Sequence, residues 1–168
     1  MVKAFDKFAA FTTRIGKYLA MLAIFVMFLL LAGEILGRSC FHYSLRIADE
    51  FAAYMMVAVT FCGMAYALRE GAILRFDMVI NHLPKSVRDV LEIGGLILAL
   101  VYFCVVAYET GISVYDAWDM EFTSVQASGI LMWIPYSILP VGVGIFIIEL
   151  IAAILRSCAS FEQKEEVR

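Results

Sequence analysis

The stretch YLAMLAIFVMFLLLAGEIL, residues 18–36, decides the fold class of this chain. It contains a single charged residue, Glu34, near its end. A helix rises 1.5 Å per residue, so the stretch would extend about 28 Å, close to the hydrocarbon thickness of a bilayer. In lipid, a spanning segment has to satisfy its backbone N–H and C=O groups internally. We therefore predict a transmembrane helix here.

Three further stretches, 51–68, 90–108 and 130–155, are long and apolar enough for the same assignment. Hydrophobic residues make up 63% of the 168 residues, charged residues make up 17%, and the mean hydropathy is +0.87. Soluble domains are only about half apolar. We predict an all-α membrane protein, with one domain of four transmembrane helices over residues 1–168 and no soluble domain attached.

Two segments outside the spans are amphipathic. Phe5, Phe8, Thr12 and Ile15 recur at helical spacing among basic residues, which is typical of a helix that lies along a membrane surface. Between the second and third spans, residues 73–83 mix apolar and charged side chains. We expect a short interfacial segment in each place.

Lysine and arginine are distributed unevenly between the two sides of the predicted membrane. Eleven of the thirteen lie before the first span, between the second and third, or after the fourth, whereas the other side has only Arg38 and Arg46. Cytoplasmic flanks retain positive charge, so both termini should be cytoplasmic. The outer loop after the third span is acidic, with Glu109, Asp116, Asp119 and Glu121. For Asp116, Asp119 and Glu121 we expect a solvated loop rather than a cation site.

Charged side chains gather where the second span begins. Asp49 and Glu50 precede its apolar run directly, where the helix dipole and unsatisfied N–H groups favour acids. We expect Arg38 or Arg46 to pair with one of these acids, and the other acid to serve a contact with another protein. Glu34 lies one turn before Arg38 and is a second possible partner for it.

Two charged residues on the other side of the membrane are also candidates for pairing or for an interface. Arg69 ends the second span, and Glu149 lies inside the fourth. A charge at bilayer depth costs on the order of 3 kcal/mol, so Glu149 needs a partner or a water-filled contact. Glu149 could take part in a structural ion pair or in a proton relay, and the sequence does not decide between these two roles.

The chain has no pattern that predicts catalysis, a cofactor or a metal site. Haem ligation would need paired histidines, whereas His42 and His82 fall on opposite sides of the predicted membrane. Motifs such as GxSxG, HExxH and the phosphate-binding loop are absent from the sequence. The net charge of −3 is small and divided between the two faces, which argues against nucleic acid as a partner.

Small residues and prolines predict how the helices pack. Gly63, Gly95, Gly142 and Gly144 offer surfaces on which helices in lipid approach closely. Pro135 and Pro140 should disturb the start of the fourth helix. We expect a kinked beginning near the outer surface there, and consider a broken helix that coordinates a substrate as the sharper alternative.

The order of several short motifs resembles the small membrane subunit (DctQ-type) of tripartite ATP-independent periplasmic (TRAP) transporters. The resemblance begins with Arg38, Phe41, Ser44 with Leu45, and the acids Asp49 and Glu50, at the spacing of that family. It continues through Gly63, Ala65 and Ala67 to Arg69, then Asp77 and the pair Leu83-Pro84, and ends with MWIPYSILPVG, residues 132–142. Ile47 stands where the family usually has Trp, and Asp49 replaces a Glu.

The resemblance implies a non-catalytic subunit of a sodium-driven transporter for organic acids in the bacterial inner membrane. Its partners would be a large elevator-type membrane subunit, a periplasmic substrate-binding protein and membrane lipids. The small subunit would enlarge the static scaffold and help present a docking surface. An autonomous four-helix carrier or channel, which would need Glu149 or Glu34 at a water-accessible site, is the alternative function. An assembly factor or membrane anchor is a third.

Overall fold

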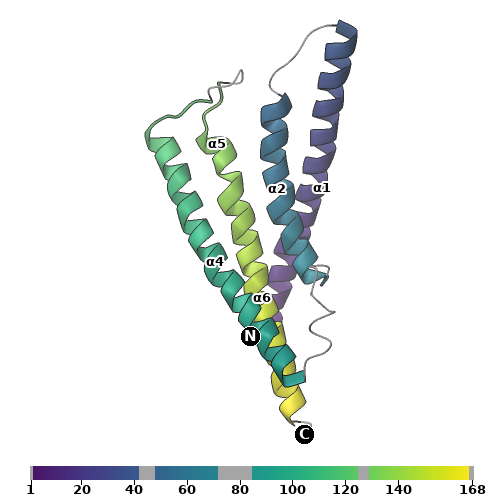
Figure 1. Cartoon of the computed structure of the whole chain (residues 1–168), viewed down its shortest axis with the longest axis vertical. Coiled ribbons are helices and arrows are strands. Elements are labelled where there is room, and N and C mark those ends of the chain that lie inside the picture. Colours follow the sequence, from purple (N-terminus) through teal and green to yellow (C-terminus); the bar gives the residue numbers. More distant parts are fainter. Residues whose placement is uncertain (1, 42–47, 72–84, 125–128, 167–168) are drawn as a thin grey trace.

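The computed structural model of the chain describes residues 2–41, 48–71, 85–124 and 129–166. Its helices are α1 (Val2–Phe41), α2 (Ala48–Arg69), α4 (Lys85–Asp119), α5 (Trp133–Tyr136) and α6 (Ile138–Glu166), as Figure 1 shows. Within the described residues, four segments are long and apolar enough to cross a membrane: Phe5–Cys40, Ala48–Arg69, Leu91–Asp119 and Trp133–Ala159. The predicted all-α membrane fold is confirmed.

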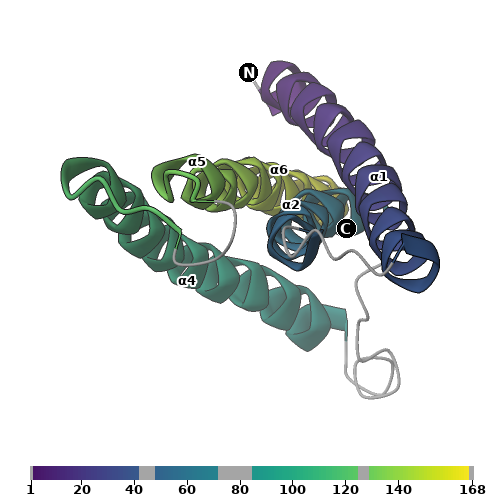
Figure 2. The same ribbon diagram turned by 90° about the horizontal axis from the view of Figure 1, so that it is seen from above.

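Both termini lie toward one end of the bundle, here called the termini end (Figure 1). The opposite end, where α2 begins and α4 ends, is the loop end. Seen from above, α2 and α6 lie between α1 and α4, and the two outer helices diverge toward the loop end (Figures 1 and 2). The second predicted interfacial segment, 73–83, falls outside the described residues.

The first helix is longer than the sequence predicts. The amphipathic N-terminal segment is helical, but it continues into the first span without a break, so that α1 has 40 residues and is about 60 Å long. The expectation of a separate helix there was wrong. Its buried face explains the difference: a stripe of small side chains runs from the N-terminal segment into the first span and is formed by Ala9, Thr13, Gly16, Ala20 and Ala23.

The centre of the molecule is α6. Phe146 and Leu150 of α6 are buried together with Ala65 of α2, and side chains of α4 pack against them. The Phe103 ring of α4 meets the Phe146 ring edge to face, with 4.6 Å between centroids. A ring pair of this geometry adds about 1 kcal/mol to the area that it buries. The core therefore joins α2, α4 and α6, while α1 packs against this core with its small residues.

One of the predicted packing glycines lies at a close helix contact. A Cβ built on Gly142 would lie 2.8 Å from Cβ of Phe61, so α6 approaches α2 as closely as only glycine allows. At Gly63, Gly95 and Gly144, a Cβ would meet nothing within 4 Å. Among the described residues, therefore, no helix of this chain approaches these three glycines closely.

The start of the fourth span is disturbed, as its prolines predict. A one-residue interruption at Ser137 separates α5 from α6, although its φ of −64° and ψ of −22° remain helical. The Ser137 N–H donates to the carbonyl of Trp133 at 3.1 Å, and its hydroxyl donates to the carbonyl of Ile134 at 2.6 Å. These backbone groups therefore form hydrogen bonds within the chain. This supports a kinked beginning of the span rather than a broken helix that coordinates a substrate.

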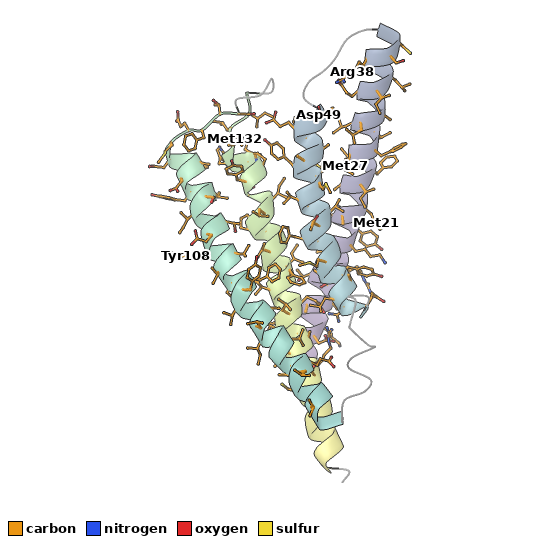
Figure 3. The ribbon with its side chains drawn as sticks, viewed as in Figure 1. Met21, Met27, Arg38, Asp49, Tyr108 and Met132 are labelled. Carbon is orange, nitrogen blue, oxygen red and sulfur yellow. The ribbon has the colours of Figure 1, made fainter. Side chains whose placement is uncertain are left out.

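The outer helices leave broad apolar surfaces exposed. Large apolar side chains with more than half of their surface exposed lie along α1, from Phe8 to Leu36, and along α4, from Leu91 to Trp118. Figure 3 shows Met21 and Tyr108 on these outer faces, and Tyr108 is 68% exposed. Among the described side chains of α2 and α6, by contrast, the exposed large apolar ones are Met56 and Val141. The outer faces of α1 and α4 therefore need lipid or another protein to cover them.

The third span also extends beyond its predicted end at residue 108. Because α4 continues to Asp119, the acids Glu109, Asp116 and Asp119 are exposed along about the last three turns of this helix instead of lying in the expected loop. The chain then turns back through a short bridge between Thr123 and Leu131. Trp118 and Trp133 pack edge to face across this turn, with 4.9 Å between ring centroids.

Candidate functional site

A buried carboxylate lies where α1, α2 and α6 meet. Glu149 of α6 has no exposed surface. The hydroxyl of Thr13 on α1 donates to its Oε2 at 2.8 Å. Nη1 of Arg69 on α2 donates to Oε2 at 2.9 Å, and Nη2 of Arg156 on α6 donates to Oε1 at 2.6 Å. Three helices therefore satisfy one carboxylate.

A second acid closes the network from outside. Oδ1 of Asp6 on α1 accepts from Nη2 of Arg69 at 3.1 Å and from Nη1 of Arg156 at 3.0 Å. Both guanidinium groups thus bridge Asp6 and Glu149, so two cations and two anions neutralise each other. We call the set Asp6, Thr13, Arg69, Glu149 and Arg156 the ion cluster.

Helix geometry explains how distant residues reach this cluster. Asp6 and Thr13 are seven residues apart on α1, as are Glu149 and Arg156 on α6, and seven residues are two turns on one face. The two helices run in opposite directions, which sets Asp6 beside Arg156 and Thr13 beside Glu149. Arg69 joins them at the very end of α2, where Gly71 with a φ of +67° ends the helix at no steric cost.

On α1, the residues of the cluster lie before the apolar run 18–36, not within it. Thr13 and Asp6 precede the apolar run 18–36 by one to three turns. The side chain of Arg69 is 19% exposed, those of Asp6 and Arg156 are 36% and 35% exposed, and only Glu149 is completely enclosed. Among the described residues, no buried polar side-chain atom is left without a hydrogen-bond partner. The network is closed, so its geometry suits holding helices together.

A smaller polar contact fixes the loop end. Glu50, in the first turn of α2, is 4% exposed. Its Oε1 accepts from the hydroxyl of Tyr54 at 2.7 Å and from the hydroxyl of Ser124 at 2.5 Å. The Met132 sulfur lies 3.6 Å from the same Tyr54 oxygen. Glu50 therefore ties the start of α2 to the chain between α4 and α5.

The remaining predicted residues lie near that end. Asp49 is exposed beside buried Glu50, and Figure 3 shows Asp49 and Arg38 both at the loop end. Nη2 of Arg38 lies 3.0 Å from Oε1 of Glu34, which is 5% exposed. Arg46 lies outside the described residues.

Sequence reasoning named Arg69 and Glu149 separately and missed the residues that connect them. Asp6, Thr13 and Arg156 were missed at the termini end, and Tyr54 and Ser124 at the loop end. The matching seven-residue intervals on α1 and α6 are the signal that could have indicated the first set. No local pattern points to Ser124, which is 74 residues from Glu50. In the part of the chain that the structure describes, no group of three or more metal-ligand side chains gathers.

Comparison with known proteins gives one family. Residues 27–159, more than three quarters of the chain, match the family model described as "Tripartite ATP-independent periplasmic transporters, DctQ component". The match contains Arg69, Glu149 and Arg156, whereas Asp6 and Thr13 precede it. A comparison with curated proteins finds no significant match.

Proposed function

The chain belongs to the family of DctQ components of tripartite ATP-independent periplasmic transporters, and on this premise we propose that it is the non-catalytic small subunit of a sodium-driven transporter for organic acids. It scaffolds a large elevator-type membrane subunit and contributes to a docking surface for a periplasmic substrate-binding protein. That the chain is a transporter component follows from the family; the driving ion, the substrate class and the scaffold role are our proposal.

The observation that carries this proposal is the lack of charged side chains in the most apolar part of each span. Residues 18–33, 51–68, 93–108 and 138–148 contain no charged side chain. Glu149, which an autonomous carrier would need at a water-accessible site, is completely enclosed and holds two arginines. Glu34, the other acid that such a carrier would need, is bound by Arg38. These contacts favour the scaffold over the carrier.

The exposed apolar faces of α1 and α4 support a scaffold that works with other molecules. None of the residues in the most apolar part of α4 is buried within the chain. Association in lipid depends on packing and on interhelical contacts instead of on apolar area alone. We propose that the large subunit covers part of these faces, and that lipid covers the rest.

The loop end supports the docking role. Asp49, Asp116, Asp119 and Glu121 are all exposed there. Residues 89–155 contain no lysine or arginine to neutralise them. We propose that this acidic end faces the periplasm and meets basic side chains of the binding protein, while both termini lie in the cytoplasm and the chain spans the inner membrane several times.

Copurification tests the proposal. An affinity-tagged chain, extracted with a mild detergent from its native membranes, should elute with one integral membrane protein that has many more spans, at a constant ratio. Mass spectrometry identifies it. Elution of the chain as a monomer or homodimer across several mild detergents would contradict the scaffold role.

A further inference from the structure

A pocket of about 180 Å³ opens between α1 and α2, next to the ion cluster. Seven polar side chains line it: Thr13, Arg14, Lys17 and Tyr18 from α1, Tyr66 and Arg69 from α2, and Glu70 directly after α2. The pocket is several times larger than the volume of about 30 Å³ that one water occupies in the liquid. It therefore has room for a polyatomic group.

The pocket holds a cation that is fixed without a carboxylate partner. Nζ of Lys17 donates to the hydroxyl of Tyr66 at 3.0 Å and lies 4.3 Å from the centroid of that ring. An ammonium group has three N–H donors, so two are left for a ligand. Among the described residues, neither Lys17 nor Arg14 has an ion pair within 4.0 Å.

The other charged groups leave the pocket positive. Arg69 is already neutralised by Glu149 and Asp6. Glu70 is the carboxylate among the lining residues, and it is exposed. Two cations thus face one solvated acid, which favours an anionic ligand.

The pocket lies at the depth of lipid headgroups. Lys17 directly precedes the apolar run 18–36, which is as long as a hydrocarbon core is thick. Beyond the pocket, exposed apolar side chains continue along one face of α1 at spacings of four, three and four residues. They are Tyr18, Leu22, Phe25 and Leu29. This line extends about 16 Å toward the loop end, roughly half of the hydrocarbon core.

We propose that this pocket is a binding site for a phosphate group, supplied by an anionic phospholipid or by soluble phosphate. Lys17 and Arg14 contact the phosphate oxygens, and Tyr66 holds the ammonium group of Lys17 in position. The apolar line on α1 then receives an acyl chain when the ligand is a lipid. The site needs only α1 and α2, so it does not depend on the transporter role proposed above.

Native mass spectrometry of the full chain in detergent, titrated with dioleoyl phosphatidylglycerol, tests the site. Each cation near a lipid surface contributes about fivefold to the affinity for anionic lipid, so Arg14→Gln combined with Lys17→Gln should weaken binding about 25-fold. Glu70→Gln should strengthen it severalfold, because this change removes the competing carboxylate. Lys17→Arg should retain binding.

Lys7→Gln is the matched control, because Lys7 is an exposed cation of the same helix that does not line the pocket. Its affinity should equal that of the unchanged chain. The same titration with millimolar inorganic phosphate as competitor separates the two sources. Displacement of the lipid by phosphate identifies a general phosphate site, and lipid retention identifies a lipid site. Equal lipid binding by the double variant and the Lys7→Gln control would overturn the proposal.

Discussion

Replacing Glu149 with glutamine should destabilise the folded chain by about 3 kcal/mol. The change keeps the size of the side chain and removes the charge that two guanidinium groups share. The new amide N–H₂ would also have to face a guanidinium group, which can only donate. Breaking a buried ion pair by removing one partner typically costs about 3–5 kcal/mol, because the other charge is left without compensation.

The structure places this cost at the lower end of that range. Asp6 still neutralises one positive charge, and the side chain of Arg156 is 35% exposed and can turn toward water. Arg69, at 19% exposed, has less access to water. The contribution of Thr13, a neutral donor, is about 1 kcal/mol.

Unfolding of the purified chain in mixed micelles, with sodium dodecyl sulfate as denaturant and circular dichroism as signal, measures the change. Glu109→Gln makes the same chemical change at an exposed position of α4 and should alter the free energy of unfolding by less than about 0.5 kcal/mol. A loss of under about 1 kcal/mol for Glu149→Gln would refute the interpretation of a buried, charge-sharing cluster.

A combined substitution separates charge compensation from packing. Replacing Arg69, Glu149 and Arg156 together by Met, Leu and Met removes every enclosed charge at similar volume, and such exchanges are often neutral or stabilising. Asp6 is left 36% exposed and can be solvated. The triple variant should therefore be more stable than Glu149→Gln alone. If the triple variant is much less stable than Glu149→Gln, the ion cluster stabilises the fold by more than the mutual neutralisation of its own charges.

Three further outcomes follow from the fold and the proposed role. Gly142→Ala should cost about 1–3 kcal/mol in the same unfolding assay, because the new Cβ would meet Phe61 at 2.8 Å, whereas Gly144→Ala should cost nothing or stabilise the helix. Equal effects of the two would contradict the close contact of α2 and α6. Substituting Asp49 and Glu50 with Asn and Gln should lower the yield of the copurified complex or the uptake by cells, and normal values of both would refute a role in assembly or docking. Of these two changes, Glu50→Gln alone should also expose the chain near Ser124 to faster hydrogen exchange, since Glu50 anchors it.

The fold was largely predictable because its determinants are local. Runs of about twenty apolar residues indicate spans whatever surrounds them, and prolines mark the break before α6. The length of α1 was not predictable in this way, because Ala9 and Thr13 reveal their role only when α6 lies against them. The glycines show the same limit, since Gly142 and Gly144 are two residues apart and only one faces a neighbouring helix.

The candidate site was predictable only in part. The apolar surroundings of Glu149 indicate that it needs a partner. Arg156 lies seven residues away on the same helix, but the other two partners come from positions 80 and 136 residues away. Which arginine reaches it depends on the angle and register of three packed helices. The helix dipole favours Asp49 and Glu50 alike, so it does not tell which of the two acids is buried at the start of α2. That depends on the position of Ser124, which only the fold sets.

Reconstituted transport tests the central claim most directly. The purified chain alone, in liposomes with an inward sodium gradient, should move no radiolabelled organic acid, whereas liposomes that also contain the copurified membrane protein and its binding protein should accumulate it. Robust sodium-dependent uptake by the chain alone would contradict the account that its enclosed charges hold helices together and offer no path for a solute.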